Sequence, residues 1–242
     1  MSPFAACLLY AIRVCVPPKR WALLLVPIVA AGLFGLLARV VDDPTPEGAF
    51  NSVSEGLFGL VLPFACLIVG DGVLGAEMRS GSFALTWLSP TPFPTIVLSR
   101  WLAGWIVASV ALAPAMVLAA IAAGLPSAIG PLVLATVAAA GAYVAMFIFI
   151  GAAVQRAALW SLAIVLLGER LLGEALAGIA QLSPQWLART TYGGLGPDAD
   201  NLLRSGVPSG SGAVVRLAIV TAVCLWLAVR RVRTPRLVGA PD

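Results

Sequence analysis

Residues 70–101 read GDGVLGAEMRSGSFALTWLSPTPFPTIVLSRW and separate two long hydrophobic runs. Taken as a helix, the stretch has a polar stripe beside an apolar one, a pattern typical of a helix lying along an interface. Three prolines then end it, because proline lacks an amide donor and disfavours helix in the residue before it. The polar stripe is Arg79, Ser82, Thr86 and Ser89, the apolar stripe is Leu74, Met78, Leu85 and Leu88, and the prolines are Pro90, Pro92 and Pro94.

Composition excludes a water-soluble globule. The chain has 242 residues, of which 60% are hydrophobic and 11% charged, and its mean hydropathy is +1.00. Soluble domains carry roughly a quarter charged residues. We therefore expect an integral membrane protein, with room for about six spans of about 20 residues each.

Cysteine and histidine usage indicates no metal site and no histidine chemistry. The four cysteines have no metal-ligand or redox spacing and lie in or beside apolar segments, which is typical of buried hydrophobic residues. The chain contains no histidine. This excludes histidine metal sites, histidine proton relays and Ser-His-Asp catalysis.

The chain divides into one transmembrane domain, residues 1–242, with an all-α fold. We expect an N-terminal interfacial helix at 1–20 and a cytoplasmic loop helix within 71–94. A short extracytoplasmic helical cap is expected at 181–212, between spans five and six. The six expected spans are 21–40, 53–70, 95–123, 132–154, 157–180 and 213–229.

Basic residues predict the orientation, since cytoplasmic loops carry an excess of Lys and Arg. Ten fall on one predicted side against three on the other, so we expect both termini in the cytoplasm. The ten are Arg13, Lys19, Arg20, Arg79, Arg100, Arg156, Arg230, Arg231, Arg233 and Arg236, and the three are Arg39, Arg189 and Arg204. The net charge of +4 is therefore a topology signal and does not indicate nucleic-acid binding.

Residues 70–101 resemble the inner loop of the permease subunits of type-2 ABC transporters. The resemblance rests on an acid at the end of span two, then an acid, a base, Gly-Ser, a proline corner and a base that opens span three. The matching positions are Asp71, Glu77, Arg79, Gly81, Ser82, Pro90, Pro92 and Arg100. It covers about thirty residues by character, and most of the chain by its layout of six spans.

The resemblance implies a function for this loop, because in that family the inner loop helix contacts the nucleotide-binding subunit. The docking residues would be Asp71, Glu77, Met78, Arg79, Ser82, Leu85, Thr86 and Leu88. The alternative is that these charges only mark the membrane boundary. The chain has no GxxxxGK[ST] loop, so we expect it to be no enzyme by itself and to bind no cofactor. ATP and Mg²⁺ would belong to a separate ATPase subunit, present in two copies.

Three charges interrupt the fifth expected span: Glu169, Arg170 and Glu174. A charge at mid-bilayer costs about 3 kcal/mol on insertion scales, so such residues usually face a cavity or a partner. One hypothesis is that they line the outer half of a translocation path. The other is that the helix bends near Gly168 and Gly173, which would place all three at the outer interface.

The resemblance therefore predicts the permease of an ATP-driven exporter in the cytoplasmic membrane, paired with a second copy or a related permease. Family substrates include drugs, antibiotics, peptides and lipid-like molecules, and apolar spans suit an amphipathic cargo. A heme-exporter-like permease of cytochrome c maturation is an alternative, although the long 181–212 segment argues against it. Alternatives from other classes are a small ion-coupled carrier, which would show two related halves, and a non-transporting immunity or scaffold protein.

Overall fold

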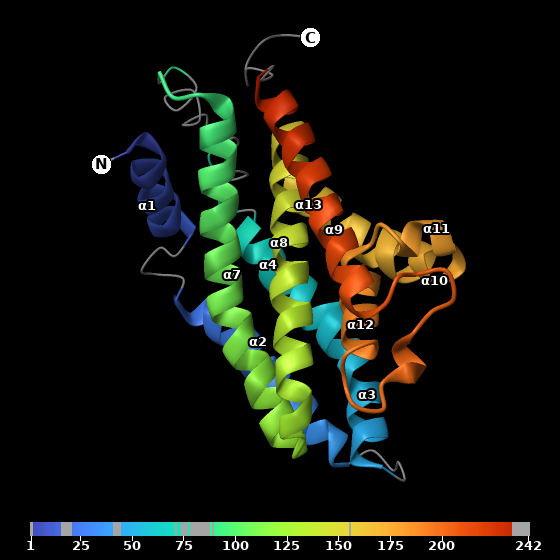
Figure 1. Cartoon of the computed structure of the whole chain (residues 1–242). Helices are drawn as coiled ribbons and strands as arrows, with labels where there is room; N and C mark the ends of the chain where they lie inside the picture. Colours follow the sequence, from blue (N-terminus) through green and yellow to red (C-terminus); the bar gives the residue numbers. More distant parts are fainter. Residues whose placement is uncertain are drawn as a thin grey trace.

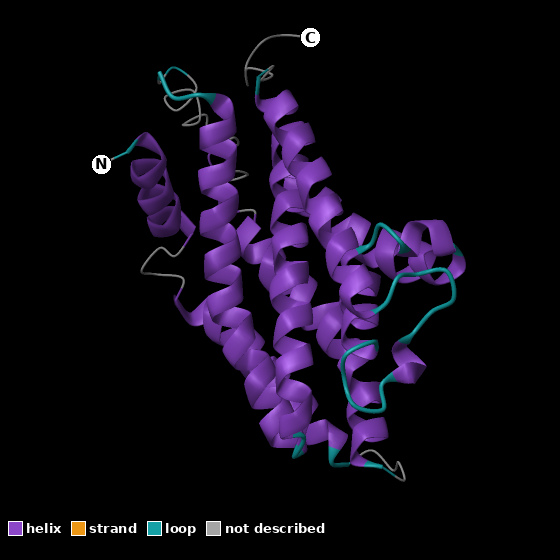
Figure 2. Ribbon diagram, in the orientation of Figure 1, coloured by secondary structure: helices purple, strands orange, loops and turns teal. Residues whose placement is uncertain are grey.

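The computed structural model describes residues 2–15, 21–40, 45–70, 72–73, 77, 88, 90–154 and 156–233, without the side chains of 21–24, 170 and 172. Within these ranges the chain is all-helical (Figures 1 and 2). Its elements are α1 Pro3–Cys15, α2 Trp21–Ala38, α3 Pro46–Gly56, η2 Leu57–Val61, α4 Leu62–Gly70, α7 Phe93–Ala123, η4 Pro126–Ala128, α8 Ile129–Ala153, α9 Ala157–Ala163, η5 Ile164–Leu172, α10 Gly173–Ala175, α11 Ala177–Ala180, α12 Pro184–Gly193, η6 Asp200–Leu202 and α13 Gly210–Val232.

Four helices of the described chain are long and apolar enough to cross a membrane. They are Pro46–Gly70, Phe93–Ala123, Pro126–Ala153 and Gly210–Val232, with 25, 31, 28 and 23 residues. Each exceeds the roughly 20 residues that a bilayer core requires. These helices support the expected membrane character, and they overlap the expected spans 53–70, 95–123, 132–154 and 213–229.

The remaining two expected spans are not among these candidates. The first, 21–40, corresponds to α2, whose described apolar part is the shorter segment Leu25–Ala38. The second, 157–180, is divided into α9, η5, α10 and α11. The helix stops at Leu176, which has extended backbone angles of φ −122° and ψ 109°. The helical backbone is continuous from Ala157 through Ala175 and ends before Leu176, so the expected span 157–180 stays a prediction.

Helix α7 is the centre of one half of the bundle and α8 of the other. Helix α7 packs against α1, α2 and α8, while α8 packs against α7, α13, α12 and α4. Small residues permit the close approach of α2 to α7. A Cβ at Gly35 would lie 2.3 Å from the carbonyl oxygen of Ala119, so the two backbones nearly touch there.

In Figure 1 the helix bundle has an upper end and a lower end. The upper end carries the start of α7 and the end of α13, and the lower end carries the start of α3 and the turn between α7 and α8. Gly124 forms that turn in a left-handed conformation, with φ 83°, and ends α7. At the upper end, Pro92 and Pro94 start α7 in the expected corner.

The expected interfacial helix exists as α1, which lies along α7 near the upper end (Figure 1). Most of the expected loop helix 71–94 lies outside the described residues. The short helix α12 does form within the expected 181–212 cap, but it does not lie on the surface. All ten of its residues are buried, and it packs against α8 and α13.

Candidate functional site

A polar seam joins α12 to η5, α8 and α3 inside an otherwise apolar protein. Helix α12 begins at Ser183, whose hydroxyl accepts a hydrogen bond from the Trp186 amide at 3.4 Å. Pro184 follows at the first helical position, where its missing amide costs nothing. The sequence of α12 is mostly polar yet buried, so its side chains must find partners within the protein.

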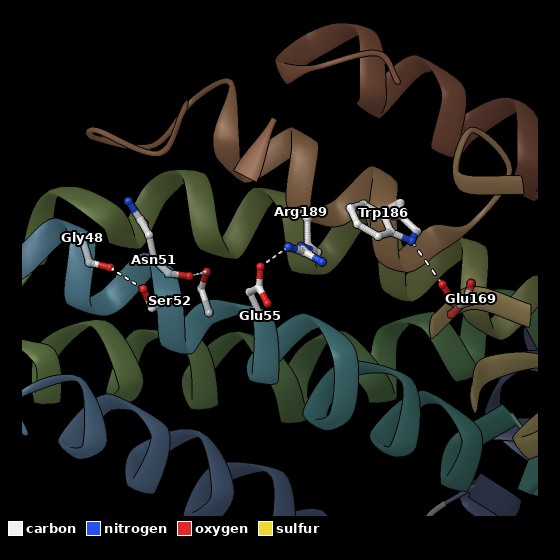
Figure 3. Close-up of polar contacts among 8 residues, drawn as sticks. Gly48, Asn51, Ser52, Glu55, Glu169, Trp186 and Arg189 are labelled. Carbon is white, nitrogen blue, oxygen red and sulfur yellow. Dashed lines mark hydrogen bonds and ion pairs between the residues drawn. The ribbon is translucent and has the colours of Figure 1, made fainter. Parts of the chain in front are cut away.

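Glu169 lies at one end of this seam, against the start of α12, and the residue is 3% exposed. Its carboxylate accepts hydrogen bonds from the Tyr143 hydroxyl at 2.5 Å and from the Ser183 hydroxyl at 3.0 Å. The backbone of Gln185 also donates to it. The carbonyl oxygen of Glu169 accepts from the Trp186 indole nitrogen at 3.1 Å (Figure 3). These donors belong to α8 and α12, so Glu169 joins three helices.

Arg189 carries the second charge of the seam. Its side chain is 9% exposed and forms an ion pair with Glu55 of α3, whose side chain is 55% exposed (Figure 3). The Arg189 guanidinium also lies 4.4 Å from the centre of the Trp186 ring, and that of Arg204 lies 4.6 Å from it. Such contacts add an electrostatic attraction to the packing of the indole. Trp186 therefore links the two charged ends of the seam.

Asn51 continues the seam toward the lower end. Its amide donates to the carbonyl oxygen of Asp198 at 2.8 Å and accepts from the Tyr192 hydroxyl at 3.2 Å. Burial raises the pKa of Tyr192, so its hydroxyl remains a donor at neutral pH. One turn of helix separates Asn51 from Glu55, so both face α12 from the same side of α3 (Figure 3).

Two π-helical segments and two glycines let α12 pack closely against its neighbours. The segments η2 and η5 are π-helical, an arrangement frequently found at functional sites. A Cβ at Gly59 of η2 would lie 3.0 Å from the side-chain nitrogen of Gln185. A Cβ at Gly173, directly after η5, would lie 2.5 Å from the indole nitrogen of Trp186. Any larger residue at Gly173 would push α12 away.

The structure places two of the three charges predicted for a translocation path, and these two lie in different surroundings. Glu169 is buried in the seam, whereas Glu174 is exposed and only its carbonyl oxygen takes part, accepting from Arg204 at 2.6 Å. The side chain of Arg170 lies outside what the structure describes. The sequence analysis missed Asn51, Glu55, Tyr143 and Arg189 as partners. The spacing of Asn51 and Glu55 on one helix face was the available signal.

The predicted ATPase-docking residues are only partly described. Asp71, Met78, Arg79, Ser82, Leu85 and Thr86 lie outside the described residues, and Leu88 is 74% exposed. Glu77 points into the protein. Its side chain is 9% exposed and forms an ion pair with Arg100 of α7 at 2.6 Å, and Arg100 also donates to the carbonyl oxygen of Val73 at 2.7 Å.

Helix α1 completes this second polar cluster. The nearby Glu77 carboxylate raises the pKa of the Tyr10 hydroxyl. Burial raises the pKa of the Cys15 thiol to about 12, so this cysteine stays protonated and unreactive at neutral pH. Glu77 and Arg100 thus tie the loop, α7 and α1 together at one place. We call these two residues and Val73 the loop anchor.

The chain matches no family model and no curated protein.

Proposed function

We propose that the chain is the transmembrane permease subunit of an ATP-driven exporter of the type-2 ABC class. The membrane part of the proposal is supported by the four helices that are long and apolar enough to span. The transport part rests on the inner loop pattern of residues 70–101 and on how that loop is attached to the bundle.

The loop anchor is the observation that carries the proposal. A loop can transmit force from a motor to a membrane helix only where it is fixed to that helix. Arg100 lies two turns into α7 and holds both the Glu77 carboxylate and the Val73 carbonyl oxygen, with both charged side chains buried. A buried ion pair of this kind resists breakage, because either charge left alone in an apolar site is strongly destabilising. Movement of the loop would therefore move α7.

The nucleotide would be bound by a partner protein. The sequence has no phosphate-binding GxxxxGK[ST] loop, so ATP and Mg²⁺ belong in this scheme to a separate ATPase, with two copies beneath two permeases. The upper end of the bundle would face the cytoplasm. The exposed Leu88, which lies in the sequence between Glu77 and the start of α7, offers an apolar contact to a partner groove.

The polar seam would line the half of the translocation path that is farther from the cytoplasm. Glu169 is buried against the start of α12 and Arg189 is a buried residue of α12 itself, so a shift of α12 would expose both to a passing molecule. An amphipathic cargo fits a path that combines such charges with apolar helices. ATP hydrolysis by the reconstituted complex that responds only to strongly hydrophilic solutes would contradict this substrate class.

Purification of the tagged chain from membranes of its native host tests the proposal. A protein carrying a GxxxxGK[ST] motif should be recovered in equal amount. Leu88→Asp should reduce that recovery at least tenfold, because it places a charge in the apolar contact. Val40→Asp is the matched control: Val40 is 79% exposed but follows α2 at the lower end, so recovery should not change. The proposal is wrong if no such protein is recovered, or if both variants behave alike.

A further inference from the structure

Helix α13 presents an apolar stripe on the surface of the bundle. Val215, Ile219, Val223 and Trp226 are 61%, 51%, 49% and 52% exposed. Their spacing of four, four and three residues places them on one face of the helix. The helix is one of the four candidate spans, so this face lies within the depth of the bilayer.

Arginines continue the stripe at the end of the helix. Arg230 follows Trp226 by four residues on the same face, and its guanidinium lies 3.9 Å from the centre of the Trp226 ring. Arg231 and Arg233 follow within the next three positions. Helix α8 ends at the same side of the bundle (Figure 1), and the exposed Arg156 follows three residues after its last residue, Ala153. The apolar stripe therefore leads directly into a basic cluster, with tryptophan at the boundary.

We propose that this face of α13 binds an anionic phospholipid, with an acyl chain along the stripe and the lipid phosphate at Arg230. Tryptophan is enriched at the depth where lipid chains meet headgroups. Arginine suits phosphate because its planar guanidinium can donate two parallel hydrogen bonds. The stacking on Trp226 holds that guanidinium in place, so little side-chain entropy is lost on binding.

Charge argues against a second copy of the chain as the occupant. In a symmetric membrane dimer through this stripe, the same residues of both copies meet at the same depth. The arginines at positions 230, 231 and 233 would then lie opposite their own counterparts. Such repulsion is costly near a low-dielectric surface, whereas an anionic headgroup neutralises it.

The test compares lipid retention by matched single variants. The detergent-purified chain is mixed with equal amounts of phosphatidylglycerol and phosphatidylcholine, and the bound lipids are counted by native mass spectrometry. Arg230→Gln should lower the preference for phosphatidylglycerol about fivefold, which corresponds to about 1 kcal/mol per basic residue. Arg39→Gln removes another exposed positive charge, at the lower end, and should change the preference less than twofold. Equal effects of the two variants, or no preference in the unaltered chain, would overturn the proposal.

A second measurement keeps every arginine of the site and uses only the conservative variant Trp226→Phe. Brominated lipids quench tryptophan fluorescence on contact, and the difference between the unaltered chain and Trp226→Phe isolates Trp226. Brominated phosphatidylglycerol should quench Trp226 more than brominated phosphatidylcholine at the same mole fraction. Equal quenching by both lipids contradicts the site. Quenching by neither shows that another protein surface covers this face, and the proposal is then wrong.

Discussion

Two ion pairs connect the candidate span Pro46–Gly70 and its following loop to other helices, and they differ in how far water reaches them. In the loop anchor, Arg100 and Glu77 are 4% and 9% exposed. In the seam, Arg189 is 9% exposed but its partner Glu55 is 55% exposed. A pair with both members buried is expensive to separate. A pair with one hydrated carboxylate separates at a cost of about 1 kcal/mol or less.

Because the two ion pairs differ in their exposure to water, they suit different mechanical roles. The loop anchor fixes Val73 and Glu77 to α7 and suits a joint that must not slip. The Glu55–Arg189 pair holds α12 against α3, yet the carboxylate can return to water when α12 moves. The chain would thus combine one rigid connection near the upper end with a releasable connection farther along the bundle.

The largest effect is expected from breaking the loop anchor on one side. Arg100→Met leaves the Glu77 carboxylate buried without its cation, which should lower the free energy of unfolding by about 3–5 kcal/mol. Thermal unfolding in detergent, followed by size-exclusion chromatography, measures the loss. The double variant Glu77→Leu with Arg100→Met removes both charges and should recover most of the stability. Equal destabilisation in the single and double variants would show that the pair is not an anchor.

A smaller effect is expected in the seam at Glu169. Tyr143→Phe deletes the hydroxyl that donates to the carboxylate at 2.5 Å and should cost about 2 kcal/mol, since a buried carboxylate loses a donor. The control is Thr221→Val on α13, whose hydroxyl bonds only the carbonyl of its own helix among the contacts described. Its cost should stay below about 0.5 kcal/mol. Similar costs for the two would mean that the Glu169 contacts add no stability.

The smallest effect is expected at the hydrated end of the seam. Glu55→Gln should change the free energy of unfolding by about 1 kcal/mol or less, because the Glu55 side chain is 55% exposed to water. Glu174→Gln removes the same charge from another exposed glutamate and serves as the control. A loss at Glu55 as large as that of Arg100→Met would erase the distinction between the two pairs.

The sequence predicts the candidate spans well because each is a long apolar window with clear stops. Pro92 and Gly124 bound α7 close to the expected 95–123, and α13 extends the expected 213–229 by three residues at each end. The expected span 157–180 was less secure, because Glu169 and Glu174 interrupt its hydrophobicity and Leu176 breaks its helix.

The burial of α12 could not be predicted from its own residues. The segment PQWLARTTYG is mostly polar and resembles a surface cap when it is considered alone. Its burial depends on partners far away in the chain, including Glu55, which lies 134 residues from Arg189. The same holds for Glu77: its charge suggests a surface contact, and only the fold reveals that Arg100 lies within reach.

Photo-crosslinking from position 88 tests most directly the claim that a separate ATPase attaches beside the loop anchor. A photoreactive phenylalanine replaces the exposed Leu88 in the native host, and Val40 is replaced in a parallel strain. Illumination of intact membranes should join position 88, and not position 40, to a protein that carries a GxxxxGK[ST] motif. An adduct formed only with a second copy of the chain, or the same adduct from both positions, would contradict the account.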